Sequence, residues 1–167
     1  MFSTQFIRHK EASQVLIDRV IALKQSAWPY PKDSQLTWIK NNLKDDDFHV
    51  ILLYNNIDIA YLNLCKVNCI INGFEVTCFG IGNVCAKEKN KGYGKKLVET
   101  INDWLTNKDK IGLLFCHPEV ESFYCKCGWS KIETSNCSIA GISQDALLYT
   151  FNIKDTVTSF CYNDRLF

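Results

Sequence analysis

A loop near the middle of the chain combines glycines with lysines in a spacing that suits an anion. Gly92 and Gly94 follow Lys89 and Lys91, and Lys95 comes directly after them. Glycines let backbone N–H groups approach a phosphate closely, and the N–H groups at the start of a helix have no acceptor within it. The spacing lacks one glycine of the dinucleotide-binding pattern, and the Walker pattern does not occur. The loop therefore predicts a pyrophosphate site, with a solvated lysine-rich loop as the alternative.

This loop resembles the acetyl-CoA signature of the GNAT superfamily of N-acetyltransferases, which reads Arg/Gln-x-x-Gly-x-Gly/Ala. The matching residues are Lys89, Asn90, Lys91, Gly92, Tyr93 and Gly94, with Lys89 in place of Arg or Gln. In that family the backbone N–H groups of the loop make most of the contacts with acetyl-CoA. The resemblance implies that this loop, with Lys95 behind it, binds the phosphates of acetyl-CoA.

A second stretch, residues 115–129, is similar to the GNAT segment Asn-x-x-Ala-x-x-Phe-Tyr-x-Lys-x-Gly-Phe. The residues in register are Phe123, Tyr124, Lys126, Gly128 and Trp129, while His117 stands in place of Asn and Val120 in place of Ala. The resemblance adds His117 to the acyl-CoA-binding residues. Because the two motifs occur in order, and a series of strands precedes them, the resemblance covers nearly the whole chain.

The resemblance assigns proton transfer to Tyr124. An amine attacks the thioester carbonyl, and the departing CoA thiolate must then be protonated, for which a tyrosine hydroxyl is a suitable donor. The alternative for Tyr124 is a buried aromatic beside Phe123, with its hydroxyl hydrogen-bonded.

The stretch from Gly80 to Val84 has two glycines inside an expected strand, which predicts a bulge or a close backbone approach. In GNAT enzymes a backbone N–H on this strand stabilises the oxyanion. The resemblance implies that the pantetheine arm of CoA pairs along Gly82, Asn83 and Val84. A strand irregularity without a ligand is the alternative.

The sequence leaves the identity of the general base open. Many relatives carry Glu or His near the positions of Cys78 and Gly80, and neither residue can serve here. Glu75, His117, Glu119 or a chain of waters are the candidates. His117 is alternatively a polar residue at the end of a strand.

The elements that must position these residues follow from periodicity and turn signals, which predict one α+β domain over residues 1–167. An antiparallel meander is expected to precede a strand–helix–strand unit, giving a mixed, mostly antiparallel sheet flanked by helices. The expected strands are 4–8, 48–54, 57–71, 74–85, 111–116, 129–133 and 146–152, and the expected helices are 11–27, 33–43, 92–106 and 120–127.

Composition limits the classes of protein that the chain can represent. Its 167 residues are 47% hydrophobic and carry a net charge of +1, so a single packed core is expected and no global field favours nucleic acid or membranes. No apolar run approaches the ~20 residues of a membrane span, and residues 1–10 do not resemble a signal peptide. We expect a cytoplasmic protein that is a monomer or homodimer.

The nine cysteines are predicted to be reduced thiols, because their number is odd and several fall inside expected strands or helices. Cys116, His117, Cys125 and Cys127 are the one group that could suggest zinc. Their spacing does not give the two cysteine pairs of a structural zinc site, so no metal is expected.

Together these patterns predict an acetyl-CoA-dependent N-acetyltransferase that acts on a small-molecule amine. A non-catalytic acyl-CoA-binding or sensor protein is the alternative. Trp28, Tyr30 and Trp38, with the acids 45–47, lie in a segment that often shapes the acceptor cleft in GNAT enzymes. Such an aromatic and acidic cleft would suit a cationic acceptor. Core aromatics and a solvated acidic turn are the other interpretation.

Overall fold

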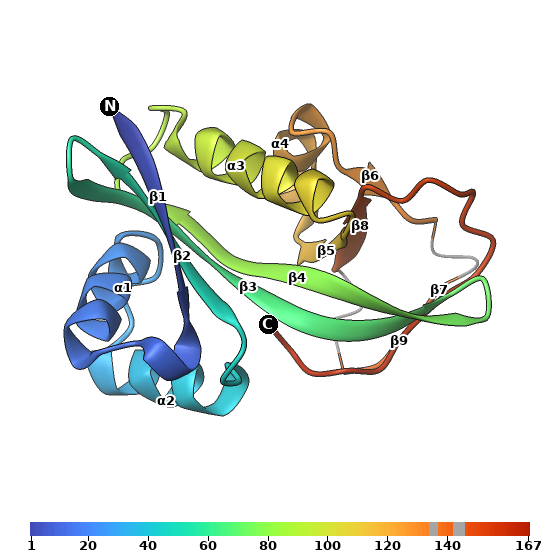
Figure 1. Cartoon of the computed structure of the whole chain (residues 1–167), viewed down its shortest axis with the longest axis horizontal. Helices are drawn as coiled ribbons and strands as arrows, with labels where there is room; N and C mark the ends of the chain where they lie inside the picture. Colours follow the sequence, from blue (N-terminus) through green and yellow to red (C-terminus); the bar gives the residue numbers. More distant parts are fainter. Residues whose placement is uncertain (134–136, 142–145) are drawn as a thin grey trace. The chain divides into compact units, whose positions relative to one another are not determined.

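The computed structural model describes residues 1–133, 137–141 and 146–167 (Figure 1). Its strands are β1 (Phe2–Arg8), β2 (Phe48–Tyr54), β3 (Ile57–Ile71), β4 (Phe74–Ala86), β5 (Ile111–Cys116), β6 (Ser130–Lys131), β7 (Cys137–Ile139), β8 (Leu147–Phe151) and β9 (Phe160–Tyr162). Its α-helices are α1 (Gln14–Ala27), α2 (Lys32–Asn42), α3 (Tyr93–Asn107) and α4 (Glu121–Lys126), with short 3-10 helices at His9–Glu11 and Pro118–Val120.

The strands form one mixed sheet in the order β1-β2-β3-β4-β5-β8-β6, and β9 pairs with both β3 and β7. Strand β2 is antiparallel to β1 and to β3, and β5 is antiparallel to β8. The pair β4–β5 is parallel, with Cys78 opposite Ile111, because α3 carries the chain back between them. The predicted fold class, a mostly antiparallel sheet flanked by helices with a strand–helix–strand unit, is confirmed.

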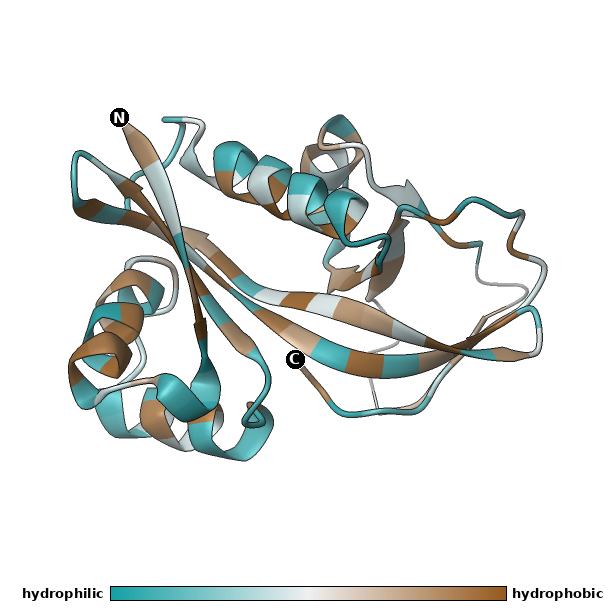
Figure 2. Cartoon of the chain, in the orientation of Figure 1, coloured by the Kyte–Doolittle hydropathy of each residue, from teal (hydrophilic) through white to brown (hydrophobic). Residues whose placement is uncertain are grey.

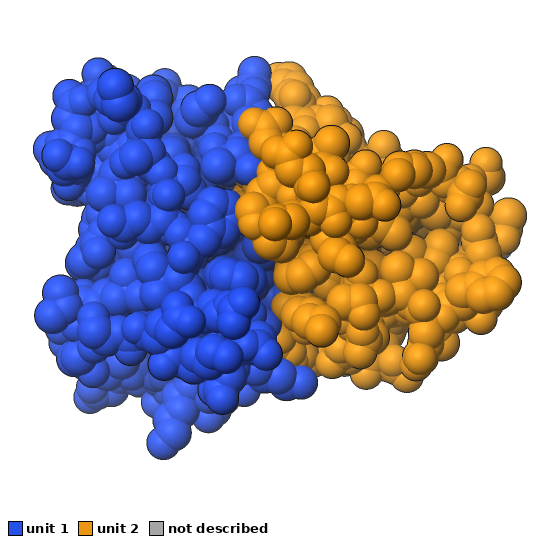
Figure 3. All heavy atoms as spheres, viewed as in Figure 1, with its two compact units in different colours: residues 1–65, 81–100, 167 blue, residues 66–80, 101–166 orange. Residues whose placement is uncertain are grey.

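The chain divides into two compact units, coloured separately in Figure 3. The first unit comprises Met1–Cys65, Ile81–Thr100 and Phe167, and the second comprises Lys66–Gly80 and Ile101–Leu166. Strands β3 and β4 and helix α3 contribute residues to both units. That the whole chain is a single domain stays a prediction.

In the first unit, α1 and α2 lie side by side next to β1 and β2 (Figure 1). Helix α1 begins after Ser13, whose Oγ accepts a hydrogen bond from the Leu16 N–H at 3.3 Å. Arg19 of α1 binds both carboxylate oxygens of Asp58 on β3, at 2.7 and 2.8 Å, which fixes the helix against the sheet. The buried apolar residues of α1 recur at helical spacing and are Leu16, Ile17, Val20, Ile21 and Leu23.

In the second unit, Trp129 is the centre of a tightly packed cluster. A Cβ at Gly112 of β5 would lie 2.6 Å from the Trp129 ring and 2.7 Å from Cδ1 of Leu105, so this position requires glycine. The indole N–H of Trp129 donates to Oδ1 of Asn102 at 2.9 Å, and Nδ2 of Asn102 donates to the Cys127 carbonyl at 2.7 Å. Figure 2 shows that helix α3 is hydrophobic along one side and hydrophilic along the other.

Some predicted boundaries differ from the observed ones. The predicted helix 11–27 begins at Gln14, because Ser13 caps it and His9–Glu11 form a separate 3-10 turn. The predicted helix 120–127 is a 3-10 turn followed by the shorter α4, and the predicted strand 129–133 is β6 alone. Strands β7 and β9 were not predicted. In the part of the chain that is described, no helix combines the length and apolar character needed to span a bilayer.

Candidate functional site

The predicted phosphate loop lies between β4 and α3, within the first unit. Asn90 and Gly92 have positive φ values, 62° and 75°, so the backbone turns sharply before the helix begins. The N–H of Lys96 donates to the Gly92 carbonyl at 2.9 Å, which is the first hydrogen bond of the helix. The N–H groups of residues 93–95 precede it and have no acceptor within the helix. The backbone here provides several donors for one anion.

Charge around this loop comes from exposed lysines. Lys89 and Lys91 are exposed and lie within the loop itself. Nζ of Lys95 lies 3.7 Å from a carboxylate oxygen of Glu99 one turn later, an exposed pair that contributes little to stability. A Cβ at Gly92 would meet nothing within 4 Å, so this glycine is required by its left-handed φ and leaves open space above the loop. These features fit a phosphate group.

The segment 82–84 of β4 departs from regular strand geometry, as the glycines predicted. Asn83 has a φ of 51°, which is rare for a non-glycine residue in a strand interior and is typical of a bulge. Its Nδ2 donates to Oδ1 of the buried Asn63 on β3, at 2.5 Å. This hydrogen bond holds the left-handed turn of the β4 backbone in place.

Gly82 is the site of a close backbone approach. A Cβ at Gly82 would lie 2.5 Å from the carbonyl carbon of Phe167 and 2.6 Å from its oxygen. Because a Cβ points out of the plane of a sheet, Phe167 covers a face of β4. A ligand that pairs with the backbone of β4 would use the edge of the strand, which is a different direction. The contact with Phe167 and the predicted pantetheine pairing are therefore compatible.

The first unit contains a pocket of about 360 Å³, and Asn83 of the segment 82–84 is one of the residues that line it. Three aromatic side chains line it, those of Trp28, Tyr30 and Trp38, so these residues are not simply core; that the pocket receives the acceptor stays a prediction. The complete lining is Lys24, Trp28, Tyr30, Ser34, Gln35, Trp38 and Asn83. Its volume is suitable for a small molecule.

The acids 45–47 are not part of this lining. Asp46 is exposed and pairs with Lys10 at 3.0 Å. Asp47 is buried, and Oδ2 accepts the Lys44 N–H at 2.7 Å, so it closes its own turn. The interpretation of this run as a turn fits better than the acidic cleft.

Lys24, Ser34 and Gln35 are residues of the pocket that sequence reasoning missed, and Lys24 is the charged one among them. Lys24 is 3% exposed, and its Nζ lies 4.3 Å from the centroid of the Trp38 ring. Burial lowers the pKa of Lys24 to about 8, and burial raises the pKa of the nearby Cys85 thiol to about 12. The available signal was its position four residues after Val20, on the apolar stripe of α1.

Tyr124 lies in α4, within the second unit, and is 9% exposed. Its ring centroid is 5.0 Å from that of Phe123 in an edge-on arrangement. Burial, reinforced by the neighbouring thiols of Cys116 and Cys127, raises the pKa of Tyr124. Its hydroxyl makes no hydrogen bond to the described part of the chain, which differs from the satisfied core tyrosine of the alternative interpretation.

The candidate bases of the sequence analysis are all exposed. His117 precedes the 3-10 turn at Pro118, Glu119 lies within that turn, and Glu75 lies near the start of β4. None of the three lines a pocket described here. Within the described residues, no three His, Cys, Asp or Glu side chains gather as a metal ion would need.

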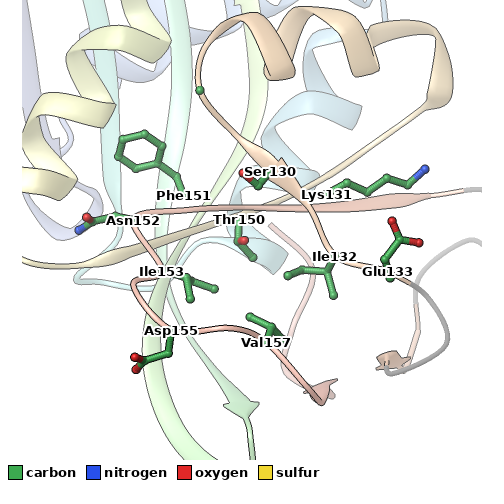
Figure 4. Close-up of a pocket in the computed structure, with 11 residues that line it drawn as sticks. Ser130, Lys131, Ile132, Glu133, Thr150, Phe151, Asn152, Ile153, Asp155 and Val157 are labelled. Atoms are coloured by element: carbon green, nitrogen blue, oxygen red, sulfur yellow. The ribbon is translucent and has the colours of Figure 1, made fainter.

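The second unit contains a larger pocket, of about 540 Å³, shown in Figure 4. The side chains of Ile132, Ile153 and Val157 point toward one another in it, whereas Lys131 and Asp155 point away. None of the predicted site residues lines this pocket. Asn83 is a predicted site residue that lines the pocket of about 360 Å³ in the first unit, so the predicted chemistry points to that pocket.

Comparison with known proteins identifies the fold. No family model matches the sequence, and no curated protein matches it. Among solved structures, ElaA from Escherichia coli aligns with a TM-score of 0.66 and 17% identity, over 90% of this chain and 99% of that chain. An acyl-CoA N-acyltransferase from Pseudomonas aeruginosa gives 0.64 and 13%, over 90% and 99%.

A third structure carries a ligand. The PaiA N-acetyltransferase from Thermoplasma acidophilum, in complex with coenzyme A, aligns with a TM-score of 0.56 and 15% identity, over 89% of this chain and 98% of that chain. At these identities the similarity shows the fold. The chain has the fold of GNAT N-acetyltransferases, as its two motifs predicted.

Proposed function

We propose that this protein is an N-acetyltransferase that transfers the acetyl group of acetyl-CoA to a small-molecule amine. The observation that carries the proposal is the β4–α3 junction, where a left-handed glycine at residue 92 and the free N–H groups of residues 93–95 form an anion site. The same fold in a coenzyme A complex of another protein supports it.

Within the first unit, the residues have distinct tasks. The loop with Lys89 and Lys91 binds the phosphates of acetyl-CoA. The bulged segment at Asn83 pairs with the pantetheine arm and directs a backbone N–H at the thioester oxygen, which develops negative charge when the amine attacks. Because Asn83 also lines the aromatic pocket, we assign that pocket to the acceptor amine.

We assign to Tyr124 the protonation of the departing thiolate. A general acid must carry its proton when the bond breaks, and a tyrosine hydroxyl is protonated at neutral pH. The amine loses a proton on attack, so the reaction is balanced when the thiolate receives one. We also propose a cytoplasmic location, because all nine cysteines are free thiols.

The test is release of free CoA thiol from acetyl-CoA in the presence of a panel of amines, with the acetylated product identified by mass spectrometry. We expect turnover with at least one amine of the panel, and none without an acceptor. CoA binding without turnover on any amine would instead indicate a non-catalytic acyl-CoA-binding protein. If the protein does not bind CoA at millimolar concentrations of CoA, the proposed function is wrong.

A further inference from the structure

We propose that the pocket of the first unit selects amines that also carry a carboxylate, such as amino acids, and that the Lys24 ammonium binds this carboxylate. The inference rests on the proposed function in one respect, because it takes the ligand of the pocket to be the acceptor. The binding of a carboxylate beside Lys24 can be measured without acetyl-CoA.

The first observation is that Lys24 is a cation and that none of the described residues lining its pocket is a carboxylate. Lys24 is 3% exposed, yet it lines the pocket. Its ammonium group makes no hydrogen bond to the described part of the chain and lies over the face of the Trp38 ring, 4.3 Å from the ring centroid. A cation–π contact of this kind offsets only part of the cost of burying an unpaired charge.

The second observation is the chemistry of the other lining groups. They are aromatic rings, the Ser34 hydroxyl and the amides of Gln35 and Asn83, so the described lining contains one cation and no carboxylate. The nearby Cys85 thiol has a pKa of about 12 and is uncharged at neutral pH. An anion that enters the pocket would therefore find one unopposed positive charge.

A carboxylate fits this site better than a phosphate. One cation balances the single charge of a carboxylate, whereas a phosphate group carries nearly two charges and is usually held by several cations or backbone N–H groups. The volume of about 360 Å³ lies at the lower end of ligand pockets and suits a molecule of amino-acid size. The Trp28, Tyr30 and Trp38 side chains offer apolar surface for the rest of that molecule.

The position of the pocket connects this recognition to the reaction. Lys24 and Asn83 line the same pocket, and Asn83 belongs to the segment along which we propose that pantetheine pairs. An acceptor anchored through its carboxylate would leave its amine free to face the thioester. Gln35 supports this wall, because its Nε2 donates to the Trp28 carbonyl at 2.9 Å.

The experiment uses matched pairs of ligands that differ only in the carboxylate. Phenylalanine is compared with phenethylamine and lysine with cadaverine, by titration of the intrinsic tryptophan fluorescence and by calorimetry. In the wild-type protein we expect the carboxylate-bearing member of at least one pair to bind about 10-fold more tightly or better, as for a charge-assisted contact. The proposal is overturned when no pair shows this preference.

Variants assign the preference to Lys24. Lys24→Met keeps the length and apolar stem of the side chain and should reduce the preference to about 2-fold or less, whereas Lys24→Arg should retain it. Lys32→Met is the matched control, because Lys32 is exposed and pairs with Asp18 at 2.8 Å outside the pocket. An unchanged preference in folded Lys24→Met protein would contradict the proposal, as would an equal loss in the control.

Binding of CoA is measured separately, without an acceptor. If the protein prefers carboxylate-bearing amines but does not bind CoA, the carboxylate site stands and the proposed transferase function fails. If CoA binds and amines are acetylated without regard to a carboxylate, the transferase stands and the role of Lys24 is wrong.

Discussion

The Tyr149 hydroxyl donates a hydrogen bond to Oε1 of Glu121, at 2.5 Å. Tyr149 lies on β8 and is fully buried, so this bond satisfies a polar group that would otherwise be costly to bury. Lys131 lies 3.5 Å from the same carboxylate oxygen and adds to the cluster. Tyr149 thus has the properties of a structural tyrosine, and Tyr124, whose hydroxyl bonds to none of the described residues, does not.

This contrast gives a test of the general acid. We expect Tyr124→Phe to lower kcat on the order of 100-fold, with the dissociation constant of CoA little changed, because only the proton donor is lost. Tyr149→Phe should do the opposite, lowering the free energy of unfolding by about 1–3 kcal/mol and leaving kcat near the wild-type value. Steady-state thiol release and urea unfolding measure the two effects. An unchanged kcat in Tyr124→Phe would assign Tyr124 to packing alone.

The phosphate loop is tested by replacing its left-handed glycine. Gly92→Val should abolish CoA binding, because a β-branched residue disfavours the φ of 75° on which the orientation of the loop N–H groups depends. The thermal shift is the measurement. Wild-type protein at 100 times the dissociation constant of CoA should gain about 2.7 kcal/mol of stability, and the folded variant should gain none.

The chain contains a matched control for this substitution. Gly73, in the turn between β3 and β4, has a φ of 84° and open space around its hypothetical Cβ, as Gly92 has. Gly73→Val therefore carries a similar backbone strain and should keep its affinity for CoA. Equal losses of CoA binding in both variants would show that the effect is general destabilisation.

His49 should make stability depend on pH. It is fully buried, its Nδ1 lies 2.9 Å from the Tyr61 hydroxyl, and its Nε2 lies 3.0 Å from Nδ1 of His9. Burial, with a smaller effect of His9, lowers the pKa of His49 to about 4. Between pH 6.5 and 4 the unfolded chain therefore binds a proton that the folded chain does not, so stability falls as the pH is lowered through this window and is unaffected above it.

The expected slope from this group is at most about 1.4 kcal/mol per pH unit. Urea unfolding of wild-type protein and His49→Gln at pH 7, 5.5 and 4.5 isolates the contribution of His49, because the other titratable groups are present in both proteins. The wild-type curve should be steeper by up to this amount below pH 6.5, and parallel curves would contradict the assignment.

Asn72 should be a strong stabilising residue of the second unit. Its Oδ1 accepts hydrogen bonds from the N–H groups of Thr158 and Ser159, at 2.7 and 3.1 Å, and its Nδ2 donates to the Thr156 carbonyl at 2.9 Å. Asn72→Ala should destabilise more than Asn56→Ala, by about 1–3 kcal/mol in urea unfolding. Asn56 is the control because it also has a positive φ, 63°, in a hairpin turn. Equal destabilisation would reduce the role of Asn72 to its backbone conformation.

Local signals were sufficient for most of the fold. Strands β2 and β3 have the predicted bounds, because Asn55 and Asn56 adopt the left-handed conformation that asparagine tolerates and so end one strand and begin the next. Strands β7 and β9 were missed for a physical reason. Each has three residues, and β9 is held by pairing with β3, some ninety positions earlier in the chain, which no local pattern records.

The candidate site also has features that consecutive residues predict and contacts that only tertiary packing creates. The glycine spacing predicted a tight turn at a strand–helix junction, and Gly92 has the positive φ of such a turn. That this loop binds phosphate stays a prediction. The burial of Lys24 depends on Trp38 from another helix, and the approach to Gly82 depends on Phe167. Such contacts are set by tertiary packing, and the sequence around Lys24 shows only a lysine on an apolar stripe.

The two compact units are assembled from interleaved stretches of the chain, since the sequence passes from one to the other at residues 65–66, 80–81, 100–101 and 166–167. No single cut in the gene releases either unit whole, and two of these crossings occur inside uninterrupted β-strands, with a third inside α3. Neither unit is one continuous segment of the chain, as an ordinary module is. A change in the length of β3 or β4 would have to be accommodated by both units at once.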